Sequence, residues 1–444
     1  MPHFDVAIIG SGASGQTVAA ECAKAGKSVA VIDRRPYGGT CSLRGCVPKK
    51  VLLAGAEAIG RSAMLVGKGV SGACSIDWPE LMAFKRSYTD PVPARTEHWM
   101  RELGIETIHG PTTFVSEGEL RVGDTSITAD AFVVATGARP MELGIEGEEY
   151  VNTSEDFLGL ESLPARIAFI GGGYISFEFA AIAHHAGAQA TIVHRSAQVL
   201  KGFDPTLAGM LAERYSSLGI DVLTDAPVKR VEKSEGGLIV VTPTARIETD
   251  LVVHGAGRVP DLQELDLSAA GIEQSRRGVT VDRRLRSTSN PKVWAIGDAA
   301  AIGMPLTPVA GAQGEVAAAN ILGGDEEFDT AATPSVIFSD PPMARVGVDA
   351  DFAESDDNLE SRFFDMSGWF TQTRVGNDTG GAVLVIDKQS DTIVGAHLLG
   401  VDADEVINVF TLAVKFGLTV AQLKTVTWSY PSLAYEINYL TGRY

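Results

Sequence analysis

The sequence has few cysteines and a shortage of basic residues. Four cysteines in 444 residues exclude a disulfide framework, so we expect a cytoplasmic protein. Lysine and arginine total 37 against 56 aspartates and glutamates, a formal net charge of −19. We therefore expect neither nucleic acid nor an anionic membrane as a partner. No apolar run is long enough to span a bilayer, and the first ten residues lack the basic start of a signal peptide.

Two of the cysteines lie in the stretch 38–50, GGTCSLRGCVPKK, with four residues between them. On a straight helix Cys41 and Cys46 would be separated by a rise of about 7.5 Å, whereas a disulfide requires Cα atoms closer than about 7 Å. The pair can form a disulfide only if the backbone bends, and Gly45 permits a bend. An isolated pair of this kind is more often structural. The two cysteines outside this stretch are predicted to be structural thiols: Cys22 and Cys74.

An apolar run followed by a G-x-G-x-x-G motif opens the chain, FDVAIIGSGASG. The first glycine of such a motif permits the tight turn, the second lets a pyrophosphate approach the backbone, and the third lets the helix pack on the strand. Here these are Gly10, Gly12 and Gly15. The helix predicted over 13–25 would direct its N-terminus at the phosphates. The next strand ends at Asp33, an acid that suits ribose hydroxyls and would repel a 2′-phosphate.

A second strand–glycine–helix unit begins at 168–176, AFIGGGYIS. Gly171 and Gly173 occupy the first two glycine positions, and Ser176 stands at the third. A small residue is sufficient there for close helix packing. Two dinucleotide-binding motifs in one chain favour a redox disulfide beside a cofactor over two structural cysteines in the stretch 38–50.

The strand after the second motif ends in cations rather than in an acid. His194 and Arg195 close this strand, and Lys201 follows shortly after. Cations at this point fit a 2′-phosphate, so we predict NADPH rather than NADH as the electron donor. The alternative is that Arg195 and Lys201 are solvated surface charges.

The remaining pattern predicts the organisation of the chain. The length of 444 residues predicts about three domains. A long exposed helix is predicted over 87–103 and short strands with glycine turns over 106–130. From about residue 333 the pattern changes to that of an antiparallel sheet with helices, one of them over 404–416.

The order of these motifs resembles that of the FAD-dependent pyridine nucleotide-disulfide oxidoreductases, the family that includes glutathione reductase, dihydrolipoyl dehydrogenase and mercuric reductase. The resemblance covers essentially the whole chain. It implies an α/β fold with two Rossmann-like dinucleotide-binding domains and a C-terminal α+β dimerisation domain, assembled as a homodimer. The implied boundaries are 1–145 and 263–330 for the two parts of the FAD-binding domain, 146–262 for the NAD(P)H-binding domain and 331–444 for the dimerisation domain.

The resemblance also implies a route for electrons from the nicotinamide through FAD to the disulfide. Cys46 would be the thiolate beside the flavin and Cys41 the exposed thiol that attacks the substrate, with a nearby helix start lowering its pKa. Lys49 and Glu178 would pair near the flavin, and Tyr174 would cover the flavin until the nicotinamide arrives. The alternatives are that Lys49 is a solvated charge, that Glu178 is an acid on the helix surface and that Tyr174 is a packing residue.

Further residues of the resembling motifs are expected to bind the cofactors. Asp298 would bind the ribityl-phosphate arm of FAD, and the helix that starts at 307–308 would direct its positive end at the flavin ring. No metal site is predicted. The full cofactor-binding set is Gly10, Gly12, Ser14, Gly15, Asp33, Gly39, Thr40, Lys50, Thr136, Gly137, Gly171, Gly173, Tyr174, Ile175, Arg195, Lys201, Gly257, Gly297, Asp298, Thr307, Pro308 and Val309.

The C-terminal stretch WSYPSLAYEINYL departs from the family pattern, which has a His-Pro-Thr sequence and a glutamate five residues after the histidine. Tyr430 replaces the histidine and Tyr435 the glutamate, with Glu436 one place later. A histidine with a pKa of about 6.5 can shuttle a proton, whereas a tyrosine with a pKa of about 10 is a poor base at pH 7. We expect Tyr430 to take part in catalysis as a hydrogen-bond donor.

A second departure lies between the cysteines, where the family usually has an asparagine. Leu43 occupies that position and Arg44 follows it. Arg44 either holds an anionic substrate, lowers a thiol pKa or is solvated.

The leading hypothesis is an NADPH-dependent disulfide oxidoreductase that acts on a small-molecule disulfide or another electron acceptor. A mercuric or other metal-ion reductase is one alternative, although the chain ends TGRY without the C-terminal cysteine pair of mercuric reductase. An NAD(P)H:quinone or oxygen reductase, with the cysteines as a redox sensor, is another.

Overall fold

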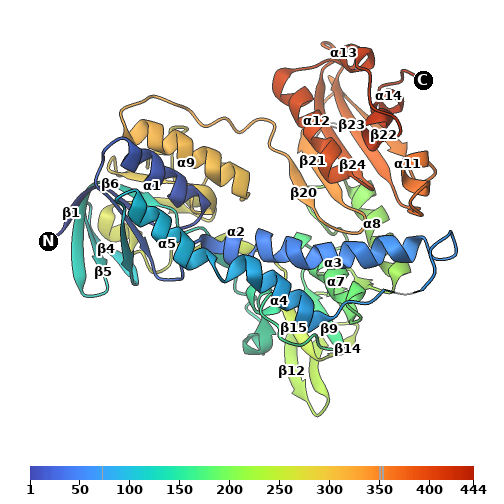
Figure 1. Ribbon diagram of the computed structural model, residues 1–444, viewed down its shortest axis with the longest axis horizontal. Helices are drawn as coiled ribbons and strands as arrows, with labels where there is room; N and C mark the ends of the chain where they lie inside the picture. The colour runs from blue at the N-terminus through green and yellow to red at the C-terminus, as the bar shows by residue number, and fades with distance from the viewer. Residues whose placement is uncertain (73, 350–351, 353–354) are drawn as a thin grey trace. The chain divides into compact units, whose positions relative to one another are not determined.

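The computed structural model describes residues 1–72, 74–349, 352 and 355–444. The chain forms two compact units, each assembled from three stretches (Figure 1). We call them the first unit, made of Met1–Lys50, Ala83–Met141 and Arg258–Thr330, and the second unit, made of Val51–Met82, Glu142–Gly257 and Ala331–Tyr444.

The first unit is organised around a seven-stranded sheet in the order β3-β2-β1-β6-β5-β4, with β19 paired to β6. Its central strands are parallel, and Ile8 of β1 lies opposite Val31 of β2 and Val133 of β6. These apolar side chains are buried, as expected for a parallel sheet with both faces covered. The strands are β1 (His3–Ile9), β2 (Val29–Asp33), β3 (Glu106–His109), β4 (Thr112–Ser116), β5 (Glu119–Val122), β6 (Thr125–Val134) and β19 (Val293–Ala295).

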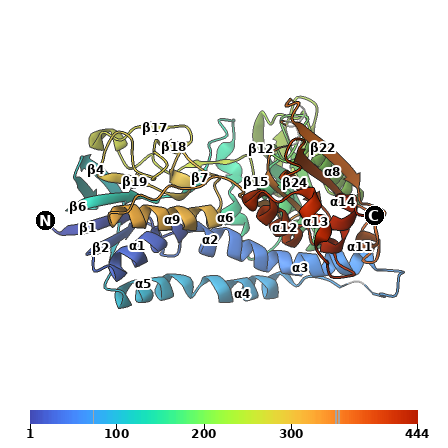
Figure 2. The ribbon, with the colours of Figure 1, turned by 90° about the horizontal axis from the view of Figure 1, so that it is seen from above.

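Two helices of the first unit lie side by side, α1 (Ala13–Lys24) and α9 (Thr307–Ile321) (Figures 1 and 2). A Cβ on Gly314 would lie 2.9 Å from the carbonyl oxygen of Ser14, so the two backbones approach closely. This packing brings the start of α9 into the same unit as the first glycine motif.

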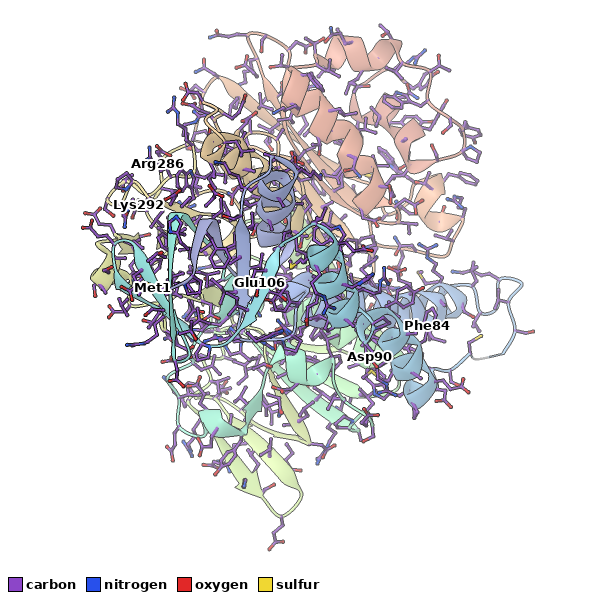
Figure 3. The ribbon with its side chains drawn as sticks, turned by 60° about the vertical axis from the view of Figure 1, so that its left-hand side comes forward. Met1, Phe84, Asp90, Glu106, Arg286 and Lys292 are labelled. Atoms are coloured by element: carbon purple, nitrogen blue, oxygen red, sulfur yellow. The ribbon has the colours of Figure 1, made fainter. Side chains whose placement is uncertain are left out.

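The long helix predicted over 87–103 is wrong. The chain instead forms α4 (Trp78–Thr89) and α5 (Val92–Glu102), and Asp90, labelled in Figure 3, lies between them. Pro91 follows Asp90 directly. Because proline lacks an amide hydrogen and its ring clashes with the preceding helical turn, it ends α4 and permits a new helix to begin. The short strands predicted over 106–130 are confirmed.

The second unit contains a five-stranded parallel sheet in the order β11-β10-β9-β15-β8 and a separate antiparallel meander, β12-β13-β14. The parallel strands and the helix after the glycine turn are β8 (Val151–Asn152), β9 (Arg166–Ile170), α7 (Tyr174–His185), β10 (Gln189–Val193), β11 (Asp221–Leu223) and β15 (Leu251–His254). The meander consists of β12 (Arg230–Ser234), β13 (Gly237–Val241) and β14 (Arg246–Thr249). The predicted second strand–glycine–helix unit is therefore present.

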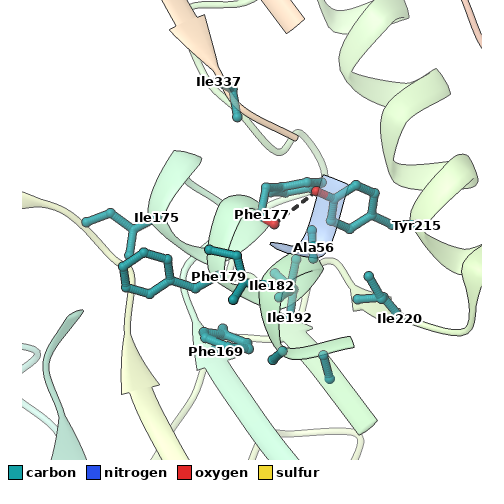
Figure 4. Close-up of a cluster of buried hydrophobic side chains, with 14 of the residues drawn as sticks. Ala56, Phe169, Ile175, Phe177, Phe179, Ile182, Ile192, Tyr215, Ile220 and Ile337 are labelled. Atoms are coloured by element: carbon teal, nitrogen blue, oxygen red, sulfur yellow. Dashed lines mark hydrogen bonds between the residues drawn. The ribbon is translucent and has the colours of Figure 1, made fainter. Parts of the chain in front are cut away.

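Aromatic side chains fill the core beside this parallel sheet. Phe169 of β9 and Phe177 and Phe179 of α7 are buried, with Tyr215 of α8 (Pro205–Leu218). The Tyr215 hydroxyl donates a hydrogen bond of 2.9 Å to the carbonyl oxygen of Phe177 (Figure 4). A buried tyrosine usually requires such a partner. Residues 175–183 of α7 are all buried, so the helix that follows the second glycine turn is packed on every side.

The C-terminal part of the second unit has the predicted antiparallel sheet, in the order β20-β21-β24-β23-β22. The predicted helix over 404–416 corresponds to α12 (Ala403–Phe416). The strands are β20 (Ser335–Ile337), β21 (Met343–Gly347), β22 (Leu359–Asp365), β23 (Gly381–Asp387) and β24 (Ile393–Leu399). No helix in the described part of the chain combines the length and apolarity that crossing a bilayer requires.

Candidate active site

The predicted bend between the two cysteines is present. Helix α2 (Gly39–Arg44) ends before Gly45, whose φ of −144° and ψ of −113° are not helical, and α3 (Cys46–Met64) begins directly after it. A Cβ at Gly45 would lie 3.0 Å from the carbonyl oxygen of Thr40. Both cysteines are free thiols, and their side chains are hydrogen-bonded to each other. The break in the helix therefore brings the two sulfurs together.

The two thiols differ in acidity. The pKa of the Cys46 thiol is lowered to about 6, first by the hydrogen bond from Cys41 and then by the Thr307 hydroxyl and the charge of Lys49, against the effect of burial, which raises it. The pKa of Cys41 is raised, first because its hydrogen bond to Cys46 holds its proton and second by burial. The expectation that a helix start lowers the pKa of Cys41 is therefore wrong, because the hydrogen bond to Cys46 and burial raise that pKa.

The two cysteines also differ in exposure. Cys46 is exposed and Cys41 is half-buried. Lys49 is buried, which excludes the alternative of a solvated charge. Lys49 therefore supplies a positive charge to the thiolate from within the first unit.

Helix α9 begins against the cysteine pair. The Thr307 Oγ1 lies 3.5 Å from the Cys46 Sγ, and Pro308 occupies the first turn of the helix, where no amide hydrogen is needed. The N-terminus of a helix carries a partial positive charge. A thiolate, a buried lysine and a helix N-terminus are thus assembled in one place.

The first glycine motif has the close contacts that were predicted. Gly10 has a φ of +115°, and a Cβ there would lie 2.2 Å from the carbonyl oxygen of Ala135. A Cβ on Gly15 would lie 2.1 Å from the carbonyl oxygen of Gly10. A Cβ on Gly39, which has a φ of +73°, would lie 2.4 Å from the Cα of Gly12. The backbone before the cysteines therefore passes directly against the first glycine turn.

Polar groups around this turn fit FAD. The Asp33 carboxylate accepts hydrogen bonds from the amide and hydroxyl of Ser11, at 2.8 and 2.7 Å. Thr136 Oγ1 is buried without a hydrogen-bond partner in the described residues, and burial raises the pKa of Asp298. A dinucleotide with a polar ribityl arm would supply partners to such groups.

The structure around the second glycine turn shows why Ser176 can stand at the third position of the motif. Gly171 has a φ of +112°, and a Cβ there would lie 2.5 Å from the carbonyl oxygen of Gly255. Ser176 is fully buried, and a Cβ on Gly255 would lie 2.1 Å from its Oγ. A serine is accommodated at the third position of the motif because the facing residue is a glycine.

Comparison with known proteins decides the family. Residues 4–314 match the family described as "Pyridine nucleotide-disulphide oxidoreductase", and residues 333–440 match the dimerisation domain of that family. The chain belongs to the pyridine nucleotide-disulphide oxidoreductases. It is therefore an enzyme of an FAD-dependent, redox-disulfide family, as its motifs predict.

Relatives of this oxidoreductase span its whole length. It is 33% identical over 449 residues to a glutathione reductase of Burkholderia cepacia, covering 99% of each chain. It is 32% identical to a mercuric reductase of Lysinibacillus sphaericus, covering 97% of this chain and 81% of the relative. Among solved structures, the Cu(II) complex of the HOCl-induced flavoprotein disulfide reductase RclA of Escherichia coli superposes with a TM-score of 0.90 at 27% identity, covering 100% of both chains.

The predicted site residues of this oxidoreductase divide between the two units. The first unit holds Gly10, Gly12, Ser14, Gly15, Asp33, Gly39, Thr40, Cys41, Cys46, Lys49, Lys50, Thr136, Gly137, Gly297, Asp298, Thr307, Pro308 and Val309. The second unit holds Gly171, Gly173, Tyr174, Ile175, Glu178, Arg195, Lys201, Gly257 and Tyr430.

Glu178 and Tyr174 lie on α7 in the second unit. Glu178 is buried, and its Oε1 accepts a hydrogen bond of 2.9 Å from the amide of Phe338. This excludes the alternative of a helix-surface acid. Tyr174 is exposed at the start of α7, so the alternative of a packing residue inside the second unit does not hold.

The C-terminal stretch of this oxidoreductase carries no histidine. Tyr430 is exposed, and its ring meets that of Tyr435 edge-on at 4.8 Å. Glu436 is buried and accepts a hydrogen bond from the Thr371 hydroxyl, while burial raises its pKa. His397 lies buried in β24, where its Nε2 meets the carbonyl oxygen of Val348 at 3.0 Å. Two polar contacts were not foreseen, those of Thr307 with Cys46 and of Thr371 with Glu436.

Proposed function

We propose that this oxidoreductase uses NADPH to reduce a small-molecule disulfide through Cys41 and Cys46, with FAD as its resident cofactor and as a homodimer. The observation that carries the proposal is the pair of hydrogen-bonded free thiols of unequal acidity. The match of residues 333–440 to the dimerisation domain supports the homodimer. FAD, when bound, would supply the chemistry that passes the two electrons of a hydride on to the cysteine pair.

The unequal acidities suit the two thiols to successive steps of disulfide exchange. Cys41 attacks one substrate sulfur while its proton passes along the hydrogen bond to the Cys46 thiolate. The first substrate thiolate leaves and takes that proton from Cys46. Cys46 then attacks the Cys41 sulfur, which releases the second substrate thiolate to be protonated by water. The two cysteines lose two electrons, and the substrate disulfide gains them.

Cys46 would thus perform part of the task of the missing histidine. A thiol with a pKa of about 6 is largely ionised at pH 7 and can take and return a proton near neutrality. Tyr430, exposed on the second unit, would act as a hydrogen-bond donor to the substrate.

The NADPH preference rests on the cations after β10. Arg195 and Lys201 are exposed, and neither is paired with a carboxylate in any ion pair found among the described residues. A 2′-phosphate would provide a partner for both.

Replacement of Cys41 tests the proposal. The Cys41→Ser variant should lose NADPH-dependent reduction of disulfides such as lipoamide, cystine and glutathione disulfide, because no mixed disulfide can form. Cys74→Ser, which removes an exposed thiol outside the site, is the control and should retain activity. Disulfide turnover by Cys41→Ser would contradict the proposal. The quinone reductase alternative would be favoured if the protein reduced quinones but no disulfide and if Cys41→Ser kept that quinone reduction.

Reduction of a soft metal ion is a second candidate. Mercuric reductases are among the relatives at 31–32% identity, and RclA was solved as a Cu(II) complex. Thiolates are the ligands that soft metals prefer. Among the described residues no cluster of three or more His, Cys, Asp or Glu could hold a metal, so Cys41 and Cys46 would be the ligands. NADPH oxidation driven by Hg(II) or Cu(II), lost in Cys41→Ser and in Cys46→Ser but retained in Cys74→Ser, would support this candidate.

A further inference from the structure

The side chain of His194 is fastened to the second glycine turn. Its Nδ1 accepts a hydrogen bond of 2.9 Å from the amide of Gly172. Its Nε2 lies 3.0 Å from the carbonyl oxygen of Gln198, to which it donates. The amide of Leu200 donates a hydrogen bond of 2.8 Å to the carbonyl oxygen of Gly172. The peptide groups of Gly172 are therefore held on both sides by the segment 194–200.

The ring also packs against the turn. A Cβ on Gly172 would lie 2.6 Å from the His194 Cγ and 2.9 Å from its Nδ1. Gly172 is buried, so the ring cannot be displaced without moving the turn. The His194 ring thus packs against the turn and fixes the backbone between Gly171 and Gly173.

Both hydrogen bonds are satisfied by one protonation state only. The Nδ1 must present its lone pair to the Gly172 amide, and the Nε2 must carry the hydrogen that faces the Gln198 carbonyl. An imidazolium carries a hydrogen on both nitrogens. It would therefore oppose the Gly172 amide hydrogen and break the contact with the turn.

The groups around the ring favour its neutral form. Burial lowers the pKa of His194, and the charges of Arg195 and Lys201 lower it further, against the Gln198 carbonyl and the charge of Asp225, which raise it. The Ser196 hydroxyl lies 3.3 Å from Nε2. A histidine held in this way is neutral at pH 7 and becomes charged only in acid.

His194 was grouped with Arg195 and Lys201 as a cation at the end of β10, and this geometry corrects that interpretation. Both nitrogens of His194 are directed at backbone groups of the turn and of the loop. The charges left for a 2′-phosphate are those of Arg195 and Lys201. His194 serves the part of the turn that is common to both pyridine nucleotides.

We propose that His194 is a positioning residue for the pyridine nucleotide: its neutral ring holds the glycine turn in the binding conformation, and its protonation in mild acid releases the turn and weakens nucleotide binding. The proposal rests on the proposed function only in that the nucleotide binds at this turn. Because folding lowers the pKa, the stabilisation is complete above the ordinary value of about 6.5 and is lost as the pH falls through the lowered value.

The direction of this effect is diagnostic. The chain has a net charge of −19, which becomes less negative as the pH falls, so general electrostatics predicts that an anionic nucleotide binds more tightly in acid. Release of the turn predicts instead that the nucleotide binds more weakly in acid. The 2′-phosphate of NADP⁺ itself gains a proton in this range, whereas NAD⁺ has no such group, so the NAD⁺ series isolates the turn.

Calorimetric titration of the FAD-loaded protein with NADP⁺ and with NAD⁺, from pH 5.5 to 8, tests the proposal. The wild-type affinity for both nucleotides should fall towards pH 5.5. His194→Asn should retain the affinity at pH 8, because its amide oxygen can accept from the Gly172 amide, and its NAD⁺ affinity should not fall in acid. His194→Ala should bind both nucleotides about three- to tenfold more weakly at pH 8, the cost of one hydrogen bond.

His98→Asn provides a matched control, because His98 has an exposed ring in the first unit; it should behave as the wild type. A wild-type NAD⁺ affinity that is constant or rises in acid would overturn the proposal even if no variant folds. So would an acid-dependent loss of NAD⁺ affinity that persists in His194→Asn. Failure of the NADPH preference would instead appear as equal affinity for the two nucleotides at pH 8, which leaves the role of His194 intact.

Discussion

The acidity of Cys46 depends on its contact with Thr307, and Thr307→Val would remove that hydroxyl while keeping the shape of the side chain. The Oγ1 lies 3.5 Å from the Sγ, a long contact, so we assign it about 1.4 kcal/mol, slightly below the range of about 1.5–3 kcal/mol for a bond to a charged group. That energy is a factor of ten in the ionisation equilibrium. With a pKa of about 6, about nine-tenths of Cys46 is thiolate at pH 7, and the variant would have about half.

The assay is the rate of alkylation of Cys46 by iodoacetamide against pH, followed by mass spectrometry of the peptide on a Cys74→Ser background. The wild-type rate should reach half its maximum near pH 6, and the Thr307→Val rate at a clearly higher pH. Thr307→Ser, which keeps the hydroxyl, should match the wild type. A wild-type midpoint at the ordinary thiol value, or identical profiles for the valine and serine variants, would refute this account of the thiolate.

Three further predictions concern the other parts of the site. Tyr430→His should shift the optimum of disulfide turnover towards neutral pH, since an imidazole can carry the proton of a leaving thiol; an unaltered pH–rate profile would remove Tyr430 from the mechanism. Arg195→Ala should lower the preference for NADPH over NADH in flavin reduction about tenfold, and an unchanged ratio would contradict the 2′-phosphate site. Gly39→Ala places a Cβ 2.4 Å from the Cα of Gly12, so it should lower the melting temperature and the FAD content of the purified protein; wild-type values of both would contradict the close approach.

The elements that neighbouring residues in the chain determine could be predicted from the sequence. An apolar run followed by glycines predicts a strand and a tight turn wherever it occurs, so both dinucleotide-binding units and the break at Gly45 could be predicted. Pro91 was a local signal as well, and the prediction of one helix over 87–103 ignored it. The rule that a helix ends before a proline would have separated α4 from α5.

Other features depend on contacts between distant segments. The burial of Lys49 and Glu178 and the fit of Ser176 against Gly255 cannot be derived from their neighbours in sequence. The lowering of the Cys41 pKa was wrongly expected because the hydrogen bond between the two thiols and the burial of Cys41 are set by tertiary structure. His194 was grouped with the cations because its hydrogen bonds to the turn are invisible in the sequence.

The proposed function requires that electrons from NADPH arrive at Cys41 and Cys46. Its most direct test is to oxidise the FAD-loaded enzyme, add one equivalent of NADPH without oxygen, and count alkylated cysteines by peptide mass spectrometry. Both cysteines should be protected from alkylation as a disulfide before NADPH is added, and both should become alkylated after it. NADPH consumption with the two cysteines equally alkylated before and after the addition would contradict the proposed function.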